Sequence, residues 1–255
     1  MSKKREVRLE RLTRKEVREA LAEGKYKAAI VATGSIEQHL EHLALEQDIA
    51  SSTHIAEQVA LKLYPKVITC VPINIGIAEH HMHSAGTLTT KPGAWLSVVF
   101  DAVDSLVRHG IKNVLILNGH GGNRAPVYGV FGQWQKYLDR EHEGVSLRFN
   151  NYWDVLSNEF VNGVQKIPGF PSHAREFETS FTMHVHPENV RTDAIQYSKD
   201  EGAAAATAET GKQLVEKIIN GVATVVEGML DGSSAAQRMP AGGNSKREKE
   251  SDPLY

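Results

Sequence analysis

The sequence lacks the features of several common classes of protein. Cys70 is the only cysteine among its 255 residues, so no disulfide can form within the chain, and we expect a cytoplasmic protein. Lysine and arginine number 29 and aspartate and glutamate 31; this balance argues against binding nucleic acid through bulk charge. No apolar run approaches the ~20 residues of a membrane-spanning helix, and the charged first residues lack the apolar core of a secretory signal, so no membrane association is expected.

Short apolar runs alternate with amphipathic segments along the chain. Buried strands are predicted for residues 28–35, 66–73, 113–117 and 146–152. Helices are predicted for residues 13–24, 49–63, 92–109, 124–142 and 203–230, whereas residues 180–185 fit either a strand or the start of a helix. This alternation predicts an α/β fold, a single-domain layered sandwich with a mostly parallel sheet flanked by helices. We expect the domain to span residues 1–231 and the polar residues 232–255 to form a poorly ordered tail.

Polar clusters follow two of the predicted strands directly. GSIEQHLEHLALEQD comes after the first strand and contains Glu37, His39 and Asp48, and NGHGGN comes after the third strand and contains His120. Ligands of such folds bind outside the carboxyl ends of the strands, where both clusters are expected. Two further clusters, AEHHMHSAGT in a long loop and HAREFETS later in the chain, add more histidines and glutamates.

These clusters combine carboxylates and imidazoles without a thiolate. Such a set argues against a structural zinc site and suits a catalytic site for Zn²⁺, Mn²⁺ or Fe²⁺. Carboxylates can bridge two ions ~3.5–4 Å apart, and such ion pairs activate water, so the chemistry implied is metal-assisted hydrolysis. Each cluster taken alone has a plainer interpretation as loop polarity, and NGHGGN alone could be a turn, a helix cap or a phosphate-binding loop. Their common place after buried strands favours the metal site.

Three motifs in this order resemble the creatininase family, the creatinine amidohydrolase-like metal hydrolases. The family pattern is G-S-x-E-Q-H-G-P-H-L-P-L-x-x-D, then G-H-G-G-N, then H-A-G-x-x-E-T-S, and the chain has GSIEQHLEHLALEQD, NGHGGN and HAREFETS. The resemblance covers roughly residues 7–230. It implies a two-metal site, with Zn or Mn as the ions and Fe as a further option, and a homo-oligomer, a hexamer in many members. The residues that it implies as metal ligands are Glu37, His39, Asp48, His120 and Glu178, with Asp48 as the bridge.

The resemblance also implies a reaction. We expect cleavage of a C–N bond of a small or cyclic amide; the alternatives are a C–C bond of a cyclic diketone or keto-inositol, or a member that binds metal without catalysis. His173 or His83 is the expected proton donor to the leaving group, and Glu178 also belongs to the expected catalytic residues.

Departures from the family pattern bear on the substrate. Leu40 and Glu41 replace the usual Gly-Pro, and Arg175 replaces the usual glycine after His-Ala. Creatininase itself carries Tyr and Glu where this chain has Gly121 and Gly122, which should free space beside the metals and weaken the case for creatinine. We therefore expect a small, polar substrate, and the residues expected to contact it are His80, Arg175, Gly121 and Trp153.

Overall fold

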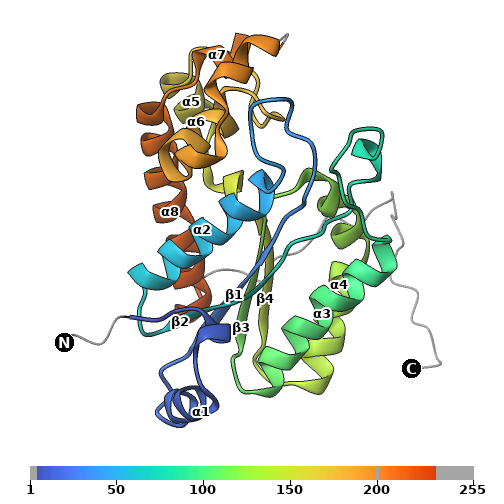
Figure 1. Cartoon of the computed structure of the whole chain (residues 1–255). Helices are drawn as coiled ribbons and strands as arrows, with labels where there is room; N and C mark the ends of the chain where they lie inside the picture. The colour runs from blue at the N-terminus through green and yellow to red at the C-terminus, as the bar shows by residue number, and fades with distance from the viewer. Residues whose placement is uncertain (1–4, 199–200, 234–255) are drawn as a thin grey trace, which may run out of the picture.

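Four parallel strands form the single sheet of the structure, a computed structural model that describes residues 5–198 and 201–233 (Figure 1). The strands are β1 (Ala28–Thr33), β2 (Val67–Ile73), β3 (Asn113–Asn118) and β4 (Ser146–Asn151), in the order β2-β1-β3-β4. All three pairings are parallel. The predicted α/β fold with a parallel sheet is thereby confirmed.

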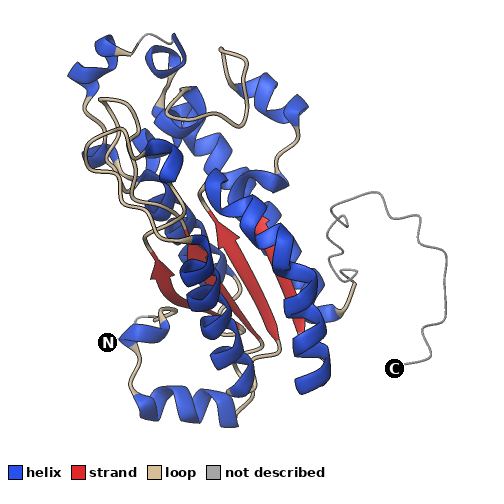
Figure 2. Ribbon diagram, turned by 90° about the vertical axis from the view of Figure 1, so that its right-hand side faces the viewer, coloured by secondary structure: helices blue, strands red, loops and turns tan. Residues whose placement is uncertain are grey.

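Helices cover both faces of this sheet (Figures 1 and 2). One face packs against α2 (Gln47–Lys62) and α8 (Ala208–Asp231), and the other packs against α3 (Pro92–Arg108) and α4 (Arg124–Glu141). The helix α1 (Arg14–Ala22) lies at the end of the molecule opposite to α5 (Asn158–Val164), α6 (Glu176–Val185) and α7 (Glu201–Ala205) (Figure 1). Among the described residues, no helix is long and apolar enough to span a bilayer.

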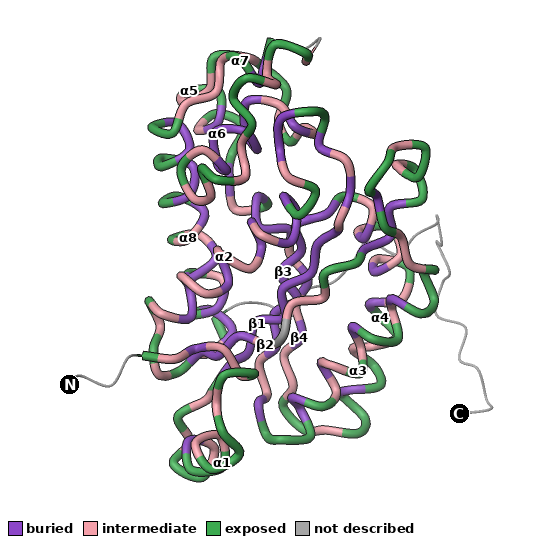
Figure 3. Tube along the Cα trace, in the orientation of Figure 1, coloured by how far each residue is buried: buried purple, intermediate pink, exposed green. Residues whose placement is uncertain are grey.

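Burial of the central strands explains their uninterrupted apolar sequence (Figure 3). Every residue of β1 is buried; Ile30 joins the core beneath α2 and α8, and Val31 joins the core beneath α3 and α4. A strand covered on both faces needs apolar side chains at successive positions rather than at alternate ones. The edge strand β4 instead alternates between buried and half-buried positions, as expected where cover is incomplete.

Two segments differ from the expected helices. Residues 180–185, which fitted a strand or a helix start, belong to α6, and this helix begins earlier, at Glu176. The long helix expected over residues 203–230 is interrupted after Ala205, because the Thr207 hydroxyl accepts the N–H of Thr210 at 3.1 Å and starts α8 afresh. Of the tail predicted for 232–255, Gly232 ends α8 in the left-handed conformation, and residues 234–255 lie outside the described residues.

The strand order creates a crevice for a site. The chain passes from β1 to β2 on one side and then to β3 on the other side of β1, so the connections after β1 and β3 diverge to opposite faces. Such a reversal is where ligands bind in open parallel sheets. The GSIEQH and NGHGGN segments follow these two strands, and both therefore lie at this point.

Candidate metal centre

The segment after β1 runs extended and is held in place by the loop that follows β2. Leu88 donates its N–H to the Ile36 carbonyl oxygen at 2.8 Å, and Gln38 donates its N–H to the Thr87 hydroxyl at 3.1 Å. Glu37 lies between these two anchored residues and His39 directly follows them, and the side chains of both are buried. Leu40, which stands where the family pattern has glycine, has a φ of 55°, in the left-handed region that favours glycine.

Asp48 reaches the same place from the first turn of α2, which begins at Gln47, two residues earlier than predicted. A carboxylate in the first turn of a helix is stabilised by the positive end of the helix dipole. The β3 loop approaches this turn very closely, because a Cβ on Gly119 would lie 2.1 Å from the Asp48 carbonyl oxygen. The glycine before His120 is therefore required for the β1 and β3 segments to meet.

Backbone carbonyls orient the two central histidines. His39 Nδ1 lies 3.1 Å from the Glu37 carbonyl oxygen, and His120 Nε2 lies 3.1 Å from the Ile77 carbonyl oxygen. Because a carbonyl only accepts hydrogen bonds, each of these ring nitrogens carries the proton. In a neutral ring, the remaining nitrogens, His39 Nε2 and His120 Nδ1, then present lone pairs. This arrangement, in which a carbonyl sets the orientation of the ring, is typical of metal-binding histidines.

The two lone pairs face carboxylates rather than donors. His120 Nδ1 lies 2.9 Å from Asp48 Oδ2 and 3.1 Å from Glu37 Oε2, and His39 Nε2 lies 3.2 Å from Asp48 Oδ1. Glu37 Oε2 and Asp48 Oδ2 are buried and have no hydrogen-bond partner. Acceptors at these separations repel unless a cation lies among them. The residues therefore fit a bound metal ion, which needs a convergent set of nitrogen and oxygen lone pairs.

Protonated histidines could supply the positive charge instead of a metal ion, and the pKa values reflect the negative charge of the surrounding carboxylates. Burial alone would lower the pKa of His39, but the facing carboxylates of Asp48 and Glu178 raise it to about 9. Burial would also lower the pKa of His120, but Asp48 and Glu37 raise it to about 10. Burial would raise the pKa of Asp48, yet His39 and His120 hold it below its usual range. The site thus strongly favours cations, and a metal that binds must displace these protons.

Glu178 brings a third carboxylate from the first turn of α6. It is buried, its Oε2 lies 3.9 Å from His39 Nε2, and it accepts the N–H of Ala174. Burial is the main reason that its pKa is raised to about 7, with the negative charge of Asp48 adding to the effect. Ala174 holds a left-handed φ of 53°, which turns its N–H towards this carboxylate.

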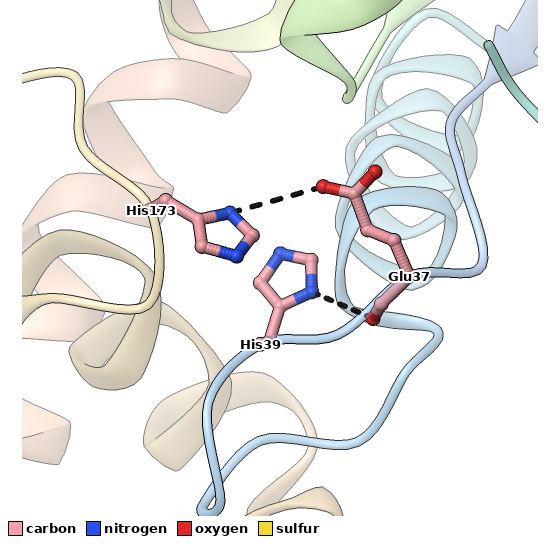
Figure 4. A group of neighbouring side chains, drawn as sticks. All are labelled: Glu37, His39 and His173. Carbon is pink, nitrogen blue, oxygen red and sulfur yellow. Dashed lines mark hydrogen bonds and ion pairs between the residues drawn. The ribbon is translucent and has the colours of Figure 1, made fainter. Parts of the chain in front are cut away.

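His173 and His81 complete the surroundings of Glu37, and Figure 4 shows His173 beside Glu37 and His39. His173 Nδ1 lies 3.8 Å and His81 Nε2 3.5 Å from Glu37 Oε1. The Gln38 amide nitrogen lies 2.8 Å from His173 Nε2 and 2.9 Å from His81 Nδ1, so one amide group donates to both rings. Burial, assisted by the charge of His39, lowers the pKa of His173 to about 4, which leaves this ring neutral at pH 7.

Potential ligand atoms form three overlapping groups among the described residues. Within each group the atoms lie within 4.8 Å of one another, and the groups are Glu37, His39 and His173; Glu37, His80 and His120; and His39, Asp48 and Glu178. The structure thus brings all five predicted metal ligands together. It adds His80 and His173, which the sequence analysis placed in the pocket or in proton transfer, as further potential ligands.

A cavity of about 260 Å³ opens onto this cluster. Its lining includes the predicted contact residues His80, Gly121 and Trp153 together with His173. Arg175 and His83 are not among the lining residues: the Arg175 guanidinium packs against Gly169, and the His83 ring lies 6.4 Å from that of His81. The cationic lining residue is instead Arg124, which the sequence analysis passed over although it directly follows NGHGGN.

Gln38 is a second residue that the sequence analysis passed over, although it stands between two predicted ligands. We expect Gln38→Met, which keeps the length of the side chain and removes its donors, to lower kcat about 10- to 100-fold and to leave the metal content unchanged, because both rings lose their common donor. Steady-state kinetics and elemental analysis measure this, with the exposed Gln196→Met as control. Unchanged kinetics in Gln38→Met would show that the amide does not position the histidines.

Comparison with known proteins agrees with the architecture and the motifs. A family model described as Creatininase, creatinine amidohydrolase, matches residues 10–226. A mycofactocin precursor peptide peptidase of Mycobacterium ulcerans is 27% identical over 191 residues, which are 72% of this chain and 67% of the relative. Creatinine amidohydrolase of Pseudomonas putida is 23% identical over 65% of this chain and 67% of that protein. A 3-dehydro-scyllo-inosose hydrolase of Thermotoga maritima is 27% identical, and the match spans 71% of this chain but only 57% of that protein.

Solved structures show the same fold. A crystal structure of creatinine amidohydrolase superimposes with a TM-score of 0.78 at 20% identity and covers 87% of this chain and 97% of that one. A manganese form of creatininase gives a TM-score of 0.76 at 21% identity, with 88% and 98% covered. The family model spans most of the chain, from the first helix to the last. This protein therefore belongs to the creatininase family of metal-dependent hydrolases.

Proposed function

We propose that the chain binds two divalent ions, zinc or manganese, and hydrolyses a C–N bond of a small or cyclic amide. The observation that carries this proposal is the approach of two unpartnered buried carboxylate oxygens, on Glu37 and Asp48, to the lone pair of His120 Nδ1. The ions would be held by Glu37, His39, Asp48, His120 and Glu178. Asp48 suits a shared position, because its two oxygens face two different histidines.

Divalent ions bound here would supply water activation and polarisation of the scissile carbonyl. The protein itself supplies proton transfer. His173 is neutral at pH 7 and lines the cavity. When its Nε2 atom releases the hydrogen bond from the Gln38 amide, it can first accept a proton and then deliver it to the leaving nitrogen. His83 lines no part of this cavity in the described residues, and we therefore assign the role to His173.

A cavity of about 260 Å³ suits a small substrate. Two of the related proteins are described as a peptidase and as creatinine amidohydrolase, both of which act on C–N bonds. Because one relative is described as a 3-dehydro-scyllo-inosose hydrolase, an oxidised inositol is the alternative substrate to be tested. Gly121 lines the cavity with open space around its Cα, so we expect creatinine to be held loosely and to react slowly.

Metal content and turnover test this proposal together. After reconstitution with Zn²⁺ or Mn²⁺, we expect about two ions per chain in the wild-type protein. Chelation should abolish hydrolysis of the best substrate in a panel of cyclic amides, formamides, creatinine and an oxidised inositol, and added metal should restore it. Less than half an equivalent of metal after reconstitution would contradict the site, and preferred cleavage of the inositol would contradict the C–N assignment.

We also propose that the protein is cytoplasmic and that it forms a homo-oligomer. The resemblance to the family favours a hexamer. Light scattering of the metal-replete protein measures its mass, and a monomer of 28.1 kDa would contradict this proposal.

A further inference from the structure

Arg124 is the only lysine or arginine among the described residues that line the cavity. It is the first residue of α4 and follows the loop that carries His120. Its Nε atom is buried and has no hydrogen-bond partner, and no carboxylate of the described residues forms an ion pair with its guanidinium. The guanidinium carbon lies 5.8 Å from the centre of the Tyr128 ring, one helical turn further on. This contact holds the side chain without neutralising its charge.

Ser172 is a second unused donor of the same cavity. Its hydroxyl is buried without a hydrogen-bond partner, and it comes from the loop before α6, away from α4 in the sequence. Leaving a buried donor without a partner is costly, so two of them in one cavity mark a place where a ligand completes their hydrogen bonds. Arg124 and Ser172 share the cavity with the apolar side chains of Trp153 and Phe177 and with the histidines and carboxylates of the candidate metal centre.

We propose that Arg124 binds a carboxylate of the substrate, with Ser172 as an additional donor to the same molecule. This inference rests on the proposed function in one respect: the molecule that Arg124 binds is the substrate that is hydrolysed at the metal-binding wall of the cavity. A carboxylate fits better than a phosphate monoester, because a single guanidinium balances one negative charge and its planar pair of donors matches two carboxylate oxygens. Arg175, the cation that the sequence suggested for this role, packs against Gly169 instead.

Matched pairs of amides that differ by one carboxylate test this inference. The pairs are 5-oxoproline and 2-pyrrolidinone, dihydroorotate and dihydrouracil, and N-formylglycine and N-methylformamide. With metal-replete wild-type protein, calorimetry should show the acid of at least one pair binding about 10- to 100-fold more tightly than its neutral counterpart. Arg124→Gln should abolish this preference, and Arg124→Lys should restore part of it. Arg140→Gln, an exposed change in the last turn of the same helix, should leave it intact.

Two results would overturn the inference. One is equal binding of acid and neutral compound in all three pairs. The other is a preference that survives in Arg124→Gln, because the carboxylate would then bind to the metals rather than to the guanidinium. Turnover of the same compounds is measured in parallel. A preference that depends on Arg124 without hydrolysis of any amide would contradict the proposed function alone, whereas hydrolysis without such a preference would contradict the role of Arg124 alone.

Discussion

Glu178→Gln is expected to lose metal and to lower kcat/KM about 1000-fold. The change keeps the size of the side chain and the acceptor for the Ala174 N–H, but it removes the negative charge that faces His39. Ion-assisted stabilisation of the transition state is worth several kcal/mol, and each 1.36 kcal/mol corresponds to a factor of ten in rate. Elemental analysis of the purified variant and steady-state kinetics on the best wild-type substrate measure both effects.

Glu176→Gln is the matched control, because it makes the same change in the same helix turn. Glu176 is also buried, but its carboxylate accepts the N–H of Lys166 at 2.9 Å and of Ile167 at 2.6 Å, away from the proposed metal ligands. We expect this variant to lose about 1–3 kcal/mol of stability and to keep its metal. Equal metal content in the two variants would show that Glu178 is no ligand.

Gly122→Ala is expected to disable the site as well, through the orientation of His120. A Cβ at this position would lie 2.4 Å from both His120 Nε2 and the Ile77 carbonyl oxygen, which are hydrogen-bonded to each other. The methyl group must push these partners apart, and the ring then turns away from Asp48 and Glu37. We expect a loss of about 10- to 100-fold in metal affinity and about 1–3 kcal/mol in stability. Competition with a chelator and thermal unfolding measure the two losses.

Gly121→Ala provides the comparison at the neighbouring position. A Cβ on Gly121 meets no atom within 4 Å, so we expect metal affinity and Tm to stay at the wild-type values. Similar metal affinities in the two alanine variants would mean that the His120–Ile77 contact does not set the ligand geometry. The pair also corrects the expectation that both glycines free space beside the metals: Gly121 has open space around it, whereas Gly122 is a close-packed position with no room for a side chain.

The sequence alone determined the class of fold and brought together the central residues that we propose as ligands. Apolar runs such as residues 28–33 mark strands buried on both faces, and the ends of parallel strands meet at one edge of a sheet. Glu37 and His120 follow two such strands and were therefore predictable as neighbours, although 83 positions separate them. The family motifs add Glu178 in the same way, because they tie a residue type to a position in the chain.

The tertiary structure decided everything that depends on the direction of a side chain or on space around a backbone atom. Arg175 and Arg124 both stand in or beside motif segments, yet only Arg124 lines the cavity, because Gly169 leaves room for the Arg175 guanidinium elsewhere. The break before α8, in an alanine-rich stretch of high helix propensity, combines the local hydroxyl cap at Thr207 with a distant contact, because Thr207 also donates its N–H to the Ser180 hydroxyl at 3.1 Å. Local sequence carries no record of such choices, because they are settled by atoms that residues far along the chain bring into contact.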